Sequence, residues 1–360
     1  MIFYTMEAND EFDLEEIVFS SNVPDKSKAY FKDIRDLRFD GLIYRETYCY
    51  MTRMRGSQYL LSTGPGLECF AVDIDTLTAK KLDIHISMLG FTNCFIDGEY
   101  MLLTGFDSGM AIFRGPRYIG KIKLHAKLEK SKNGCIIYGR YAQQVGKTVY
   151  AVDQDGRLYR IEWQDIKEGK YQKTLVKPHV QNFYVDKILG MATVDRAGTL
   201  SLDNGVEVDL KKVDSLAIWM VETCIAKCWI VCGDNGDRTS IASISKKGKV
   251  ISRLTIKLTL KGCKNYFGRE YGGIYALQKV YVRGTRGIMM AIESDGCCHL
   301  ISVDYGRLSI LQSIDSIVPL DRDMAKHAYD HIVKSVAATA TRGEFIVCGW
   351  KWIRMITLKL

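Results

Sequence analysis

Cysteine and histidine side chains are the groups in this sequence best suited to metal or nucleophilic chemistry. Cys224, Cys228 and Cys232 recur at every fourth residue, and residues 297–299 read Cys-Cys-His. On a β-strand an even spacing places side chains on one face, which is typical of core packing. Neither set has the paired C-x-x-C arrangement of a zinc ribbon or a redox site. We therefore interpret both as buried reduced thiols, and we expect no metal and no cofactor.

Two further motifs resemble functional sites, but a purely structural role explains each of them better. His327 and His331 stand four residues apart and would share one face of a helix, but a third strong zinc ligand is missing at a recognisable spacing. The segment 139–148 looks like a phosphate-binding loop, yet six residues separate its glycines where four are needed. The first motif predicts a solvent-facing helix and the second a hairpin loop. None of the six histidines lies in a recognised catalytic motif, so we do not expect an enzyme.

The composition predicts a protein of the cell interior, cytoplasmic or nuclear. The eleven cysteines are an odd number and lie mostly in apolar stretches, as expected of thiols in a reducing compartment. The N-terminus lacks the basic start of a secretory signal, and no apolar run approaches the roughly 18 residues of a membrane helix. The net charge of +8 is a mild bias that permits an anionic partner without indicating a dedicated nucleic-acid protein.

From about residue 40 to the C-terminus, short apolar segments alternate with turns that contain Gly, Asp or Asn. Seven hairpins follow one another at a spacing of roughly 40–50 residues, which is the period of propeller blades. The runs are too short and too rich in Val, Ile and Tyr for helical repeats. The seven turns fall at residues 64–66, 107–109, 155–156, 197–198, 234–236, 295–296 and 349–350.

Two segments have a helical pattern and lie outside the repeated strands. We expect a helix over residues 25–38 and a second one over 321–333, as short helical decorations. The last unit reaches the C-terminus after three strands, so its fourth strand must come from elsewhere. We expect an N-terminal strand to supply it, residues 1–5 rather than 16–20, which removes a sheet edge prone to aggregation. The whole chain, 1–360, would then form a single propeller domain.

The hairpin units, the Asp-Gly-type turns and the missing closing strand resemble the WD40-like β-propeller superfamily. The resemblance covers nearly the whole chain, although the Gly-His and Trp-Asp dipeptides of that family are absent. The nearest match is Glu162-Trp163, followed by Gln164 instead of Asp. The resemblance implies an all-β propeller of about seven four-stranded blades. A six-bladed or PQQ-type propeller is the alternative.

Two enlarged connections, residues 259–271 and 313–330, flank the sixth unit and are expected on one side of the fold. Long loops on a rigid frame are frequent recognition sites, and the first connection interleaves basic and aromatic residues. The alternative is that these aromatic side chains pin the loop to its blade. The predicted partner-binding residues are Lys264, Tyr266, Phe267, Arg269, Asp295 and Trp350.

These features together predict a non-catalytic protein-interaction scaffold, a subunit of a larger intracellular complex whose partners are other proteins. The alternative function is binding of an anionic partner, RNA or a phosphoinositide membrane, through basic loops. The Phe-Arg-Arg-Gly motif of phosphoinositide-binding propellers is missing from the sequence.

Overall fold

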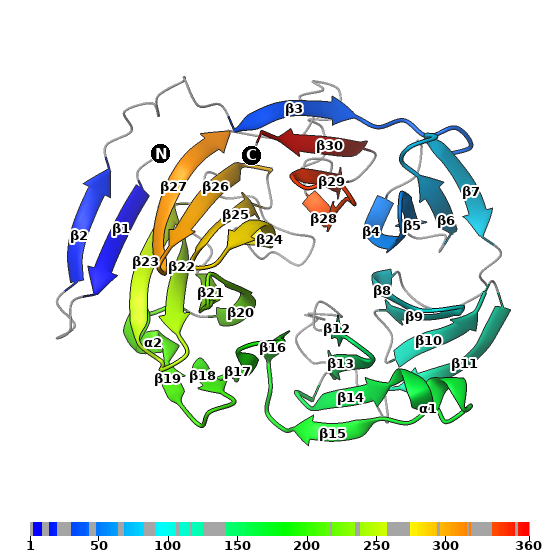
Figure 1. Cartoon of the computed structure of the whole chain (residues 1–360), viewed down its shortest axis with the longest axis horizontal. Helices are drawn as coiled ribbons and strands as arrows, with labels where there is room; N and C mark the ends of the chain where they lie inside the picture. Colours follow the sequence, from blue (N-terminus) through cyan, green and yellow to red (C-terminus); the bar gives the residue numbers. More distant parts are fainter. Residues whose placement is uncertain are drawn as a thin grey trace, which may run out of the picture. The chain divides into compact units, whose positions relative to one another are not determined.

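Antiparallel β-strands make up most of the described part of this computed structural model (Figure 1). The structure describes residues 3–8, 14–19, 30–42, 48–63, 68–82, 91–105, 109–115, 117–124, 142–153, 155–216, 218–234, 238–257, 274–293, 296–314, 317, 333–349 and 352–359. None of the helices formed by these residues is long and apolar enough to cross a membrane.

The strands form seven sheets, and each contains one of the predicted hairpins as its second and third strands. Six sheets have four strands, and one is extended to six. The prediction of an all-β propeller with seven four-stranded blades is confirmed, as is the presence of short helical decorations. The chain divides into two compact units, which are described in turn.

One unit holds the described residues within 34–180 and 334–356 and contributes four sheets. The last of these sheets is completed at its edge by β3. The elements are β3 (Phe31–Asp36), β4 (Tyr48–Arg55), β5 (Gln58–Thr63), β6 (Cys69–Asp73), β7 (Thr78–Leu82), β8 (Phe91–Asp97), β9 (Tyr100–Gly105), β10 (Gly109–Arg114), β11 (Arg117–Lys123), β12 (Ala142–Val145), β13 (Thr148–Val152), β14 (Leu158–Glu162), α1 (Trp163–Lys167), β15 (Thr174–Lys177), β28 (Val333–Ala338), β29 (Glu344–Gly349) and β30 (Trp352–Leu358).

The other unit holds the described residues within 1–33, 181–333 and 357–360 and contributes three sheets. Its middle sheet is the six-stranded one, in the order β2-β1-β23-β22-β21-β20. The elements are β1 (Phe3–Ala8), β2 (Leu14–Phe19), β16 (Asn182–Asp186), β17 (Gly190–Val194), β18 (Thr199–Leu202), β19 (Glu207–Asp209), α2 (Leu210–Val213), β20 (Ile218–Ile225), β21 (Cys228–Asp234), β22 (Arg238–Ser245), β23 (Val250–Lys257), β24 (Ile274–Arg283), β25 (Arg286–Glu293), β26 (Cys298–Asp304) and β27 (Arg307–Ile314).

The position of a strand within its sheet explains its composition. The inner strand β10 is buried over five successive residues, Gly-Met-Ala-Ile-Phe, because side chains on both of its faces pack into the core. Its neighbour β11 lies at the edge of the same sheet and is largely exposed. Strands buried on both faces read as continuous apolar runs, which is why the inner hairpins could be recognised from sequence. Three tryptophans, Trp163, Trp219 and Trp229, are among the largest fully buried side chains.

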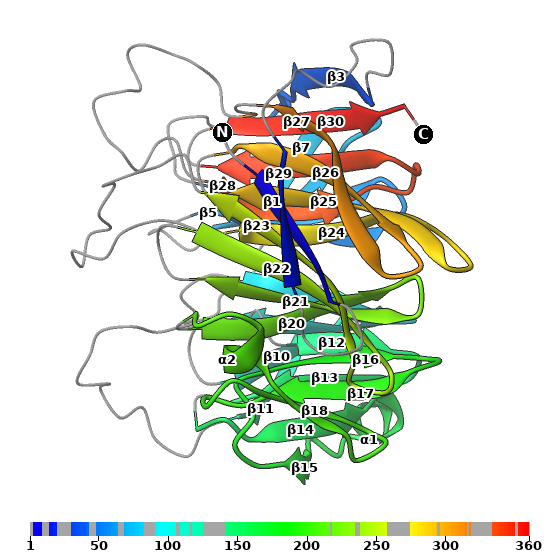
Figure 2. The ribbon, with the colours of Figure 1, turned by 90° about the vertical axis from the view of Figure 1, so that its left-hand side faces the viewer.

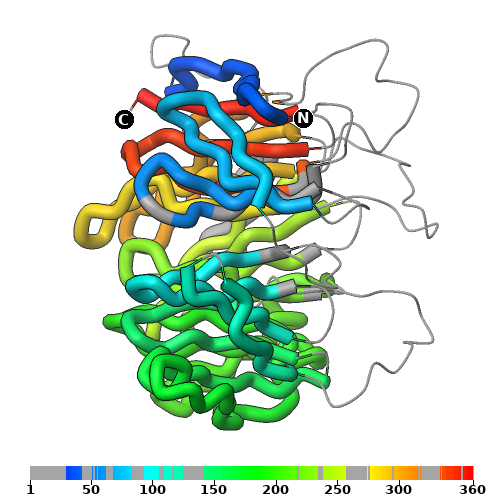
Figure 3. Tube along the Cα trace, turned by 90° about the vertical axis from the view of Figure 1, so that its right-hand side faces the viewer, coloured from blue at the N-terminus to red at the C-terminus, as the bar shows by residue number. Residues whose placement is uncertain are grey.

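The predicted helix over residues 25–38 is wrong in its described part, because residues 31–36 form strand β3. Tyr30 and Leu37 make backbone hydrogen bonds to Lys359 and Ile353 at either end of β3 (2.7 and 2.8 Å). β3 therefore lies beside β30, at the edge of the sheet β28-β29-β30-β3 (Figure 3). Pairing with the open edge of β30 outweighs the weak local helical preference of this segment. The second predicted helix, 321–333, lies outside the described residues except for Val333, which begins β28.

The expected closing strands, residues 1–5 and 16–20, lie elsewhere, as far as they are described. β1 pairs antiparallel with β23, with Phe3 opposite Ile256, and β2 pairs with β1. Figure 2 shows β1 running along β23. The fourth strand beside β30 is β3, which follows both of them in the chain. Short strands rich in apolar residues resemble one another in sequence, so pattern alone did not identify which one pairs with β30.

Asp97, at the end of β8, connects its sheet to the following one. Its carboxylate accepts a hydrogen bond from Lys147 Nζ (2.5 Å), in the β12–β13 turn, and forms an ion pair with Lys167 Nζ (2.6 Å), in α1. These two lysines lower the pKa of the Asp97 carboxyl below its ordinary value. A carboxyl whose pKa is lower in the folded state than in the unfolded state, where it is about 3.9, stabilises the fold fully at pH values above 3.9. This stabilisation is lost as the pH falls through the pKa of the folded state.

Replacing Asp97 with Asn should therefore lower the melting temperature at pH 7, with the difference from wild type shrinking as the pH falls below about 4. The expected loss is about 1 kcal/mol or less, since the side chain of Lys147 is 74% exposed. Thermal melts at pH 7, 5 and 3.5 measure it. Asp155→Asn is the control, because Asp155 pairs with Arg157 inside a single turn (3.1 Å). A difference for Asp97→Asn that persists unchanged at pH 3.5 would contradict an electrostatic cause.

Candidate functional site

All six predicted partner-binding residues lie outside the described part of the chain. Their segments are flanked by described strands: 258–273 by β23 and β24, 294–295 by β25 and β26, and 350–351 by β29 and β30. The prediction for these residues therefore stays a prediction. The set consists of Lys264, Tyr266, Phe267, Arg269, Asp295 and Trp350. Two other features of the described residues have the chemistry of a functional site.

The first feature arises from a turn between the second and third strands of three sheets. In two of these turns an aspartate carboxylate accepts the backbone N–H four residues further on: Asp153 from Arg157 and Asp195 from Thr199, both at 2.8 Å. The glycine before that donor has a positive φ, +78° at Gly156, a conformation that side chains disfavour. In these turns the acid has a structural role, because its carboxylate caps the turn.

In the third turn the same positions carry different side chains. Glu293 replaces the aspartate, Cys297 stands four residues on and His299 six residues on. The backbone geometry is shared: Gly296 N donates to Glu293 O (2.9 Å), as Gly156 N does to Asp153 O (3.1 Å). This turn therefore keeps the fold of the other two and changes their chemistry.

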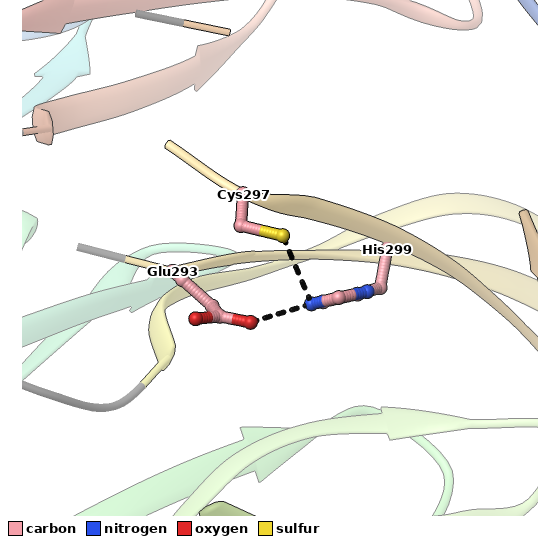
Figure 4. Close-up of side chains that lie close together, drawn as sticks. All are labelled: Glu293, Cys297 and His299. Atoms are coloured by element: carbon pink, nitrogen blue, oxygen red, sulfur yellow. Dashed lines mark hydrogen bonds and ion pairs between the residues drawn. The ribbon is translucent and has the colours of Figure 1, made fainter. Parts of the chain in front are cut away.

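Glu293, Cys297 and His299 converge on one point inside the sheet β24–β27 (Figure 4). His299 Nε2 lies 2.7 Å from Glu293 Oε1 and 3.7 Å from Cys297 Sγ. The other imidazole nitrogen, Nδ1, lies 2.8 Å from Ser313 Oγ. Both Cys297 and His299 are fully buried, and Glu293 is 2% exposed.

This Glu–His–Cys cluster has the residue types of a nucleophilic triad, but its burial does not suit that chemistry. A catalytic cysteine must meet a substrate, whereas no part of Cys297 reaches the surface and its Sγ donates to Ile314 O (3.3 Å). What the arrangement can do is hold a buried proton between two side chains or bind a metal ion. Among the described residues, these three form the group of His, Cys and carboxylate side chains close enough to share an ion.

The spacing of residues 297–299 predicts core packing, and their burial is confirmed. Glu293 could not be recognised in the same way, because a carboxylate before a turn looks like any other turn residue. Comparison of positions across the three turns would have revealed it, since only this turn places ligand types at all three positions. Eight cysteines of the described part of the chain are buried and form no disulfide: Cys69, Cys94, Cys224, Cys228, Cys232, Cys297, Cys298 and Cys348.

The second feature is an exposed apolar surface in the unit that contains β11 and β15, the edge strands of two sheets. Tyr171 packs against Gly120 of β11, where a Cβ atom would lie 2.4 Å from the Tyr171 ring. Lys173 Nζ donates to Leu124 O (2.6 Å), so the segment before β15 follows the end of β11. Four large apolar or aromatic side chains of β11, β15 and the segment before β15 are exposed; we call them together the β11–β15 patch, and they are Tyr118, Tyr171, Leu175 and Val176, at 48, 37, 53 and 40%.

The two sequence segments that supply the β11–β15 patch are basic. Residues 117–124 and 170–179 contain six lysines and arginines and no acidic residue; the six are Arg117, Lys121, Lys123, Lys170, Lys173 and Lys177. Lys173 also stacks on Tyr159, with Nζ 4.0 Å from the ring centroid. Lys170 is paired locally with Glu168 (2.7 Å). Aromatic and apolar groups with a basic border have the composition of a protein interface that binds an acidic partner.

Comparisons with solved structures identify the fold. The chain is similar to YCF48 bound to D1 peptide, with a TM-score of 0.56 at 12% identity over 91% of this chain and 97% of that one. A chain of the mitotic checkpoint complex gives 0.58 at 10% identity, covering 95% and 98%. Streptogramin B lyase, a propeller enzyme, gives 0.57 at 7% identity, covering 91% and 98%. No protein-family model and no curated protein sequence matches the chain.

At these identities the similarity shows the fold alone. The chain has the fold of a WD40-like β-propeller with seven blades, as its sequence resemblance implied. Propellers of this kind commonly mediate protein interactions, and an enzyme is also found among the similar structures.

Proposed function

We propose that this chain is a non-catalytic protein-interaction scaffold that serves as a subunit of a larger intracellular complex. The observation that carries the proposal is the β11–β15 patch, because large apolar and aromatic groups with a basic border are costly to leave in water without a partner. Eight buried cysteines of the described residues form no disulfide, which supports an intracellular location, where thiols remain reduced.

Two of the similar structures support protein or peptide partners. YCF48 was solved with a bound peptide, and the mitotic checkpoint complex is an assembly of proteins. For the present chain, the charge of the patch favours an acidic protein segment with apolar side chains. Tyr118, Tyr171 and Leu175 would contact the apolar side chains of this segment, and the lysines would attract its acidic side chains.

Replacing Tyr118 with Ala and Leu175 with Ser should reduce partner recovery at least about tenfold, because truncation of central interface side chains costs roughly 1–2 kcal/mol each. Recovery is measured by affinity purification of the tagged full chain from its source cell, with quantitative mass spectrometry. The melting temperature should change little, since both side chains are about half exposed. The matched control is Ile188→Ser with Tyr305→Ser, which removes exposed apolar groups (84 and 67%) outside the patch.

The same experiment compares the patch with the loop surface predicted from sequence. Charge reversal of Lys264 and Arg269 should weaken recovery if the 259–271 connection is the interface. If the charge-reversal variant loses the partner while Tyr118→Ala/Leu175→Ser recovers it fully, the interface is the loop and not the β11–β15 patch. A partner that proves to be RNA or anionic vesicles, with affinity falling steeply with salt, would replace the proposal with the anionic-ligand function.

A further inference from the structure

We propose that Glu293, Cys297 and His299 form a binding site for a zinc ion. Their ligand atoms, Oε1 or Oε2, Sγ and Nε2, all lie within 4.8 Å of one another. Zinc is bound at about 2.0–2.3 Å from nitrogen, oxygen and sulfur, which separates its ligands by roughly 3–4 Å. The Sγ–Nε2 distance of 3.7 Å already has this value, and the Nε2–Oε1 distance of 2.7 Å needs to open only slightly.

The surroundings of His299 are those of a metal-binding histidine. A ligating imidazole binds the metal through one nitrogen and donates its other N–H to a fixed acceptor, which holds the ring in place. Nε2 of His299 faces Glu293 and Cys297, and Nδ1 faces Ser313 Oγ at 2.8 Å. The ring is therefore oriented for a ligand at Nε2.

Electrostatics also favours an ion at this place. Zinc would carry two positive charges, and the Cys297 thiolate and the Glu293 carboxylate one negative charge each, while His299 stays neutral. The complex has no net charge, which reduces the cost of burying these groups in a site with no exposed cysteine or histidine surface. Binding releases the thiol proton and any proton shared by Glu293 and His299.

The residues at the equivalent positions of the other two turns indicate that the cluster is not a chance feature of this turn type. Position for position, the other two turns carry Asp153, Arg157 and Tyr159, or Asp195, Thr199 and Ser201. Neither set could bind zinc with sulfur and nitrogen ligands. The turn at Glu293 keeps a carboxylate at the first position and carries a zinc ligand type, Cys or His, at each of the other two, and the three side chains meet.

The test uses the full chain, purified without a histidine tag or chelator. We expect about one zinc ion per chain by plasma mass spectrometry. After zinc removal, cobalt(II) should give visible ligand-field bands and a near-ultraviolet thiolate-to-cobalt charge-transfer band. Wild-type protein that holds no zinc and shows no such bands with cobalt would overturn the proposal, and this measurement needs no variant.

Variants identify the ligands. Cys297→Ser should abolish the charge-transfer band and weaken zinc binding by roughly 100-fold or more, since even outer-sphere changes cost about 10–100-fold. Cys298→Ser is the matched control: this cysteine is equally buried, but it points to the other face of β26 and should keep the band. A charge-transfer band that survives Cys297→Ser in folded protein would place the metal elsewhere and overturn the assignment.

Discussion

Deletion of residues 1–36, which removes β3, is expected to lower the melting temperature by about 5 °C and to promote aggregation. β3 makes backbone hydrogen bonds along β30, and losing about four of them at ~1 kcal/mol each gives roughly 4 kcal/mol. For a chain of 360 residues the unfolding entropy converts this to about 5 °C. The deletion also exposes the edge of β30, which can pair with another molecule.

Deletion of residues 1–20 is the control for this experiment. It removes β1 and β2 but leaves all seven sheets with four strands, because β23 still has β20–β22 beside it. Its melting temperature should stay closer to that of wild type, and differential scanning calorimetry and light scattering measure both effects. Equal melting temperatures for the two deletions would show that β3 adds nothing measurable to the stability, because the longer deletion lacks the β1–β2 hairpin as well.

Asp214→Ala is expected to destabilise the fold by about 3–5 kcal/mol, which corresponds to a melting temperature roughly 4–7 °C lower. Asp214 follows α2, and its buried carboxylate accepts hydrogen bonds from Ser240 Oγ (2.5 Å) and Arg238 Nη2 (3.0 Å). Arg253 Nη1 lies 3.5 Å from the same carboxylate. The substitution removes a negative charge that faces two guanidinium groups, one of which has a side chain only 16% exposed.

Asp209→Ala is the matched comparison for Asp214→Ala, because both aspartates flank α2. Asp209 is exposed, and its carboxylate caps the helix by accepting from Lys211 N (3.1 Å), so the loss should be about 1 kcal/mol. Thermal denaturation followed by circular dichroism measures both variants. If Asp214→Ala melts no lower than Asp209→Ala, the buried carboxylate is not a major stabilising group.

The hairpins show why much of this fold could be predicted. In β9 and β10, or β21 and β22, apolar β-forming residues surround turns with Gly and Asp, and the strand pairing is local in sequence. β3 shows the limit, because its partner β30 lies more than 300 residues away and nothing in either segment encodes that pairing. The same holds for β1, whose position beside β23 depends on which edge remains open.

The candidate sites could likewise be predicted from sequence only in part. Cys297 and His299 could be placed on one strand face from their spacing, but Glu293 joins them only because the turn returns the chain to the same point. The β11–β15 patch depends on contacts between residues about 50 positions apart, such as Tyr171 with Gly120.

The β class, the seven hairpins and the burial of eight cysteines could be predicted from the sequence, because these depend on local spacing and on the apolar character of each strand. The place of β3 in the last sheet, the meeting of an acid, a thiol and an imidazole at one interior point, and the packing of Tyr171 on β11 became visible only in the folded chain. The physical reason is that spacing fixes the face on which a side chain lies, whereas its neighbours on other strands are fixed by packing that the whole chain must satisfy together.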